Sequence, residues 1–96
     1  MHALLIAINS KYVHTALGLR YVGEYAKAQG FDVHLIEETI NTPILAVLEN
    51  IMDVKADVYA FSVHIWNKPF VYRLISMLKK LRPEATIVVG GPEVAF

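Results

Sequence analysis

Short apolar runs alternate with longer stretches of helical periodicity along the chain, and this alternation constrains the fold more than any other feature. Each run ends at a polar residue or a glycine, as strands usually do. Strands that alternate with helices build parallel sheets through right-handed crossovers. We therefore expect four parallel strands, near residues 3–8, 31–37, 57–63 and 86–90.

The segments between these runs carry apolar residues every three or four positions, which predicts helices on both faces of the sheet. They cover residues 15–30, 43–52 and 70–81. In the first segment Leu17, Tyr21 and Tyr25 form the repeating stripe, and Gly30 is a suitable helix stop. The predicted fold class is α/β, a three-layer doubly wound parallel sheet of the flavodoxin or Rossmann-like kind.

The first run, Ala3 to Ile8, is almost wholly apolar, which is typical of a central strand buried on both faces. The commonest order for such a sheet places the second strand outside the first and the third on the first strand's other side. A ligand then binds where the order reverses, at the carboxyl ends of the first and third strands.

Composition excludes several classes of protein. Nine basic and nine acidic residues cancel, so nothing draws the chain to nucleic acid or to an anionic membrane. The apolar start is too short to span a bilayer and lacks the features of a signal peptide. The absence of cysteine excludes disulfides, thiolate metal sites and iron–sulfur clusters within these residues. We expect a cytoplasmic protein with neither a nucleic-acid nor a membrane partner.

Three segments should meet at the ligand edge: residues 9–15, 62–68 and 90–94. Gly90 and Gly91 either admit a bulky ligand or simply form a tight turn. Ser62 either donates a hydrogen bond to a ligand or satisfies local backbone groups. Trp66, beside His64, is costly to expose unless it packs on a ligand or on the domain's own helices.

No catalytic or metal site emerges from the residues themselves. The chain has no GxGxxG, GxxxxGK[ST] or GxSxG motif and no nucleophile at a suitable spacing from a base. His14 either meets a ligand or metal in the loop after the first strand, or is only solvated. His2 and His34 have no metal-ligand partner at useful spacing, and we interpret both as structural.

Three stretches carry a resemblance to a known family: residues 9–19 (NSKYVHTALGL), 61–67 (FSVHIWN) and 88–93 (VVGGPE). Over essentially its whole length, the chain resembles the N-terminal cobalamin-binding domain of cobalamin-dependent radical S-adenosylmethionine enzymes. That group includes the anaerobic magnesium-protoporphyrin IX monomethyl ester oxidative cyclases. Its cobalamin domains carry DxHxxG after the first strand, SxL after the third and GG after the fourth.

The three signatures are matched unequally. Gly90-Gly91 matches the GG signature, and Ser62 matches the first position of SxL, with His64 in place of leucine. DxHxxG is not met, because Tyr12 stands where aspartate is expected and the glycine comes one residue late. Since that aspartate would orient the ligating imidazole, its absence weakens the expectation that His14 ligates cobalt.

The resemblance implies a cobalamin-binding module that is noncatalytic alone, with Ser62 contacting the cofactor's nucleotide tail and Gly90-Gly91 making room for it. The corrin ring would lie over the loops, against Trp66. The implied cofactor-binding residues are Asn9, Ser10, His14, Ser62, His64, Trp66, Gly90 and Gly91. The partner would be the radical domain of the same parent, a methyltransferase or oxidative cyclase, whose CxxxCxxC motif holds a [4Fe–4S] cluster that binds S-adenosylmethionine.

We interpret residues 1–96 as the N-terminal part of this domain, truncated after the fourth strand, whose exposed edge should favour self-association. Two alternatives stay open. One is a degenerate domain of the same fold that has lost the cofactor and serves as a scaffold or docking surface. The other is a stand-alone α/β enzyme whose site is not recognised.

Overall fold

The computed structural model describes residues 2–10 and 16–90, which form one parallel sheet and three helices. Its strands are β1 (His2–Asn9), β2 (Asp32–Thr39), β3 (Val58–Ser62) and β4 (Thr86–Gly90). Its helices are α1 (Ala16–Ala28), α2 (Ile44–Met52) and α3 (Lys68–Leu81). All strand pairs are parallel and the order is β2-β1-β3-β4, so the predicted strands and their order are confirmed.

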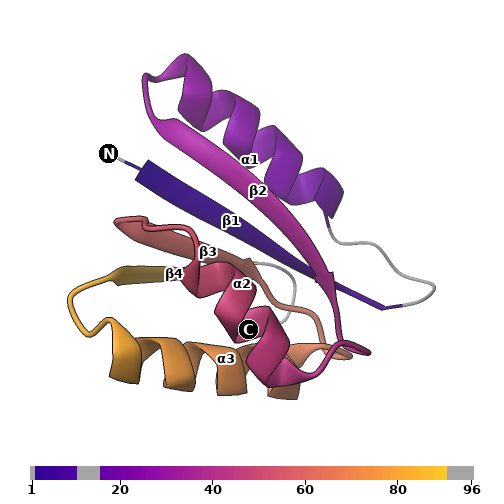
Figure 1. Ribbon diagram of the computed structural model, residues 1–96. Helices are drawn as coiled ribbons and strands as arrows, with labels where there is room; N and C mark the ends of the chain where they lie inside the picture. Colours follow the sequence, from indigo (N-terminus) through magenta and orange to yellow (C-terminus); the bar gives the residue numbers. More distant parts are fainter. Residues whose placement is uncertain (1, 11–15, 91–96) are drawn as a thin grey trace.

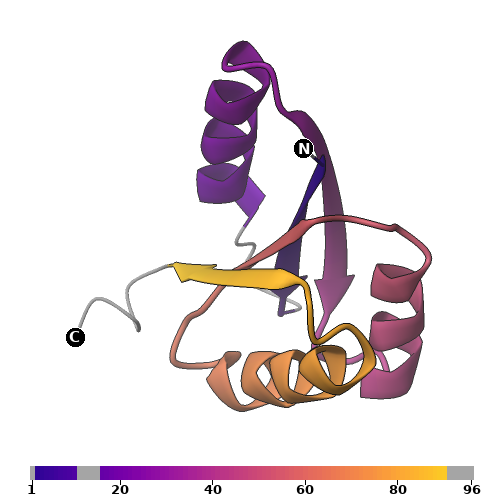
Figure 2. The same cartoon turned by 90° about the vertical axis from the view of Figure 1, so that its left-hand side faces the viewer.

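The layers are those of a doubly wound domain (Figure 1). Helix α1 lies on one side of the sheet, over β1 and β2, and α2 and α3 lie together on the other side (Figure 2). The predicted α/β fold class with a Rossmann-like arrangement is therefore confirmed. No helix among residues 2–10 and 16–90 is long and apolar enough to cross a membrane.

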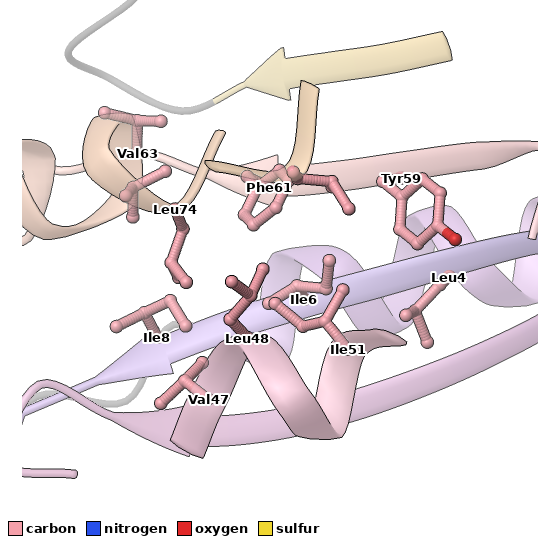
Figure 3. Packing of buried hydrophobic residues seen from close by; sticks show 12 residues of the cluster. Leu4, Ile6, Ile8, Val47, Leu48, Ile51, Tyr59, Phe61, Val63 and Leu74 are labelled. Atoms are coloured by element: carbon pink, nitrogen blue, oxygen red, sulfur yellow. The ribbon is translucent and has the colours of Figure 1, made fainter. Parts of the chain in front are cut away.

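The main core fills the space between the sheet and the α2–α3 layer. Alternate residues of β1 point into it, and their cross-strand partners on β3, Tyr59 and Phe61, point the same way. Figure 3 shows these side chains meeting Val47 and Ile51 of α2 and Leu74 of α3. All five of these named side chains are at most 1% exposed, so this layer carries most of the domain's hydrophobic stabilisation.

Helix α1 was predicted correctly, and the two tyrosines of its repeating stripe lie on its outer side. Tyr21 and Tyr25 are each 70% exposed, whereas Gly23 is buried against the sheet. A Cβ on Gly23 would come within 3.0 Å of Leu5 Cδ1. The helix therefore approaches β1 through a residue without a side chain, and the large rings remain on its outer side.

The C-terminus of α1 agrees with the expected glycine stop. Gly30 has a positive φ of 93°, a conformation that residues with a Cβ rarely adopt. The Gly30 amide donates to the Lys27 carbonyl and the Phe31 amide donates to the Ala26 carbonyl. These two bonds form a Schellman motif, which satisfies carbonyls that the helix itself leaves unpaired.

Within residues 2–10 and 16–90, no helix covers the α1 side of the sheet over β3 and β4. By register, Thr86, Val88 and Gly90 share this side with Ala60 and Leu5, yet all three β4 residues are exposed. Val88 is 48% exposed, and β4 is the edge strand of the described sheet. Self-association through β4 stays a prediction.

Candidate functional site at the carboxyl ends of the strands

The site predicted from sequence corresponds to the point where the connections from two neighbouring strands diverge. After β1 the chain forms α1 on one side of the sheet, and after β3 it forms α3 on the other side (Figure 2). The β1–β3 pairing runs only as far as Ile6 and Phe61, so both strands continue beyond the last paired residues. Such a divergence creates the crevice in which doubly wound domains bind ligands.

Two of the predicted residues are direct neighbours at this edge. Ser62, the last residue of β3, pairs with Gly90, the last residue of β4. The Gly90 carbonyl accepts a hydrogen bond of 2.7 Å from the Val63 amide, which extends the pairing past the end of β3. The backbone therefore fixes the relative position of Ser62 and Gly90.

The local backbone does not require glycine at position 90. Its φ is not positive, and a Cβ built there would meet nothing within 4 Å among the described residues. A turn that demands glycine is thus not the explanation at this position, whereas free space for a ligand is compatible with it. Gly91 lies outside the described residues.

Ser62, His64 and Trp66 form a connected group in the loop after β3. Ser62 Oγ lies 3.2 Å from His64 Nε2, within hydrogen-bond distance. The His64 ring stacks on the Trp66 ring with 5.7 Å between centroids and 14° between planes. The half-buried indole thus packs on a neighbouring loop residue.

Asn67, a residue that sequence reasoning did not select, holds this loop to the sheet. Its side chain is fully buried, and Nδ2 donates to the carbonyls of Ile8 (3.1 Å) and Ser62 (3.3 Å). Its Oδ1 accepts from the His64 amide at 2.7 Å. In the sequence, an asparagine just before Lys68-Pro69 is typical of a helix cap, which concealed this role.

Asn9 and Ser10 end β1 at the same edge. Asn9 is 5% exposed, and its Nδ2 donates to Glu37 Oε1 on β2 at 3.2 Å. The other carboxylate oxygen of Glu37 accepts from Arg20 of α1 at 2.8 Å. These contacts join β1, β2 and α1 near the edge, with Ser10 half-buried directly after the strand.

A family model described as the B12 binding domain matches residues 3–96. The chain belongs to the B12-binding domain family. No curated protein matches it significantly. The match covers nearly the whole chain and supports the predicted cofactor, cobalamin, so this B12-binding domain is a cobalamin-binding module.

Two other histidines of this B12-binding domain, His2 and His34, lie away from the site. His2 and His34 lie on β1 and β2 with ring centroids 4.7 Å apart, toward the amino ends of those strands. Within the described ranges, no three histidine, aspartate or glutamate side chains are placed to hold a metal ion. His14 lies outside the described residues, so its predicted role is not tested.

Two hollows of the B12-binding domain lie away from this edge. One, of about 910 Å³, is lined by residues 55–57, 82 and 84–86 at the amino ends of β3 and β4. The other, of about 230 Å³, lies beneath α1 beside Leu5 and Gly23. The features that fit a bulky cofactor are instead the Ser62 hydroxyl and, among the described residues, the space at Gly90 and the exposed side of β4.

Proposed function

We propose that this chain is the noncatalytic, cobalamin-binding module of a larger radical S-adenosylmethionine enzyme of the methyltransferase or oxidative cyclase type. The observation that carries the proposal is the pairing of Ser62 with Gly90 at the carboxyl edge of a B12-binding domain, next to space that no described residue fills. Cobalamin is large, and its nucleotide tail needs such space in or beside the sheet.

In the proposal, the tail lies along the side of β3 and β4 that no described helix covers. This strip contains Ala60 and Ser62 of β3 and Val88 and Gly90 of β4. Ala60 and Val88 offer apolar surface, since Val88 is 48% exposed, and Gly90 adds no side chain that would obstruct the tail. The Ser62 hydroxyl supplies a hydrogen bond to a polar atom of the tail.

The loop after β3 supports the other end of the cofactor. The stacked rings of His64 and Trp66 present a flat surface beside Ser62, and a flat aromatic surface suits the corrin macrocycle. Asn9 and Ser10 contribute polar groups from the end of β1, and His14 and Gly91 complete the proposed set. Cobalamin, when bound, supplies organocobalt chemistry, and the protein supplies binding and orientation.

The radical parent is proposed from the resemblance of residues 9–19, 61–67 and 88–93 to the cobalamin domains of such enzymes. Residues 1–96 would then be the N-terminal part of the cobalamin domain. The [4Fe–4S] cluster and S-adenosylmethionine would belong to a catalytic domain elsewhere in the parent, in the cytosol. The chain itself has no cysteine with which to ligate a cluster.

The test is a direct binding measurement. The chain is incubated with hydroxocobalamin and passed through gel filtration, and we expect cobalamin absorbance to elute with the protein. A folded chain that elutes without cobalamin at saturating concentrations would favour the degenerate-domain alternative. A parent sequence without CxxxCxxC would remove the radical-enzyme part of the proposal and leave cobalamin binding intact.

A further inference from the structure

Asn67 makes three hydrogen bonds through a side chain that has no contact with solvent. Both amide protons are used, one on the Ile8 carbonyl of β1 and one on the Ser62 carbonyl of β3. The amide oxygen binds the His64 backbone, 2.7 Å away. A buried primary amide with its donors and its acceptor engaged is a strong and geometrically specific link.

The two carbonyls that Asn67 binds lie just beyond the end of the β1–β3 pairing. That pairing stops at Ile6 and Phe61, and the bound carbonyls belong to residues further along each strand. The asparagine amide therefore stands in for the sheet hydrogen bonds that are lost where the strands diverge. In this way it fixes the separation of β1 and β3 at the mouth of the crevice.

Helix capping does not account for asparagine at this position. Asn67 is the residue before α3, but its side chain makes no capping bond, and its φ and ψ of −109° and −1° are not those of a usual cap. The contribution of Asn67 to the first turn comes from its backbone, whose carbonyl accepts from the Val71 amide. The side chain points into the domain, where it forms hydrogen bonds with the ends of β1 and β3 and with the backbone of the loop.

We infer that Asn67 is a positioning residue of the cobalamin site: it sets the width of the crevice and holds His64 and Trp66 beside Ser62. This inference rests on the proposed function for its ligand. The loop of residues 63–67 is held at both ends, by the Val63 amide on Gly90 and by the Asn67 side chain on Ile8. Without the Asn67 side chain, the loop would keep the Val63 contact with Gly90 and the His64 contact with Ser62, but it would lose its link to β1.

Asn67→Asp tests the inference with almost no change of shape. The substitution keeps an acceptor for the His64 amide but removes both donors and sets carboxylate oxygens against two carbonyls. Asn67→Ala removes the three side-chain hydrogen bonds without adding a charge, and it replaces the aspartate variant in the test if that variant does not fold. Leu78→Ala is the matched control, because it removes buried volume from the far end of α3.

Two measurements are made on each folded variant. Trp66 is the only tryptophan, so its emission reports on this loop without any ligand. We expect an Asn67 variant to shift that emission and to raise the Kd for hydroxocobalamin about tenfold, as loss of a buried hydrogen bond would. Leu78→Ala should leave the emission unchanged and change Kd by less than about twofold, although it destabilises the fold.

Unchanged emission and Kd in the Asn67 variants, or an equal loss of binding in Leu78→Ala, would overturn the inference and leave Asn67 as an ordinary stabilising residue. If the unsubstituted chain does not bind hydroxocobalamin, the proposed function fails and the cofactor part of the inference fails with it. The Trp66 emission then still decides whether Asn67 holds the loop.

Discussion

Ser62 and Gly90 are cross-strand partners at the last paired position of β3 and β4, although they lie far apart in the sequence. The pairing puts a hydroxyl group beside a position where no described residue occupies the space. In a B12-binding domain, Ser62 can then hydrogen-bond to the ligand, and Gly90 leaves room for the same ligand beside it.

Gly90→Leu should abolish cobalamin retention while leaving the domain folded. The new side chain enters space that is open among the described residues, and the backbone at Gly90 is not strained, so we expect stability to change by about 1 kcal/mol or less. Thr86→Leu is the matched control, because Thr86 lies on the same strand and side at its amino end. Gel filtration with hydroxocobalamin reads retention, and equal retention by both variants would refute the assignment of Gly90.

Ser62→Ala should weaken cobalamin binding about tenfold, because it removes one hydrogen bond in a partly desolvated site. His64→Ala should cause part of the same loss, since His64 Nε2 lies 3.2 Å from Ser62 Oγ and orients it. The double variant should then lose less affinity than the sum of the two single losses, which is the signature of coupled residues. Titration with hydroxocobalamin gives the three constants, and additive losses would show that the two residues act separately.

Arg82→Ala should lower the free energy of unfolding by about 2 kcal/mol. The Arg82 guanidinium donates to the carbonyls of Met52 (2.8 Å) and Val54 (3.2 Å) at the end of α2, and it also contacts the Tyr59 hydroxyl. Removing it leaves carbonyls near a helix C-terminus without their cationic donor. Urea denaturation measures the loss, with Arg73→Ala, an exposed arginine on α3, as a control expected to change stability by less than about 0.5 kcal/mol.

Gly30→Ala should destabilise the domain by about 1 kcal/mol through backbone strain alone. The φ of Gly30 is 93°, and a Cβ there would meet none of the described residues within 4 Å, so we expect no steric clash to contribute. Gly30→Asn should cost less, because asparagine tolerates positive φ better than alanine does. Thermal denaturation ranks the variants, and an alanine variant as stable as the unsubstituted chain would contradict the strain argument.

The local sequence pattern predicted the strands, the helices and the α/β fold class. Each of these depends on the spacing of apolar residues and on the glycine and polar residues of nearby turns. Gly30 ended α1 as its conformational freedom suggested. The same pattern did not show which side of α1 faces the sheet, since Tyr21 and Tyr25 follow helical spacing although both are exposed. Which side faces the sheet depended on how closely the helix could approach Leu5, and Gly23 decided it.

The candidate site was likewise predicted in part from sequence and decided in part by the tertiary structure. Sequence alone identified Ser62, Gly90, His64 and Trp66 as candidates, because residues that end parallel strands gather at one edge of the sheet. Only the tertiary structure brought Ser62 against Gly90 and turned the Asn67 amide inward to join β1, β3 and the loop. Those contacts depend on strand register and on where the β1–β3 pairing ends, and long-range packing sets both.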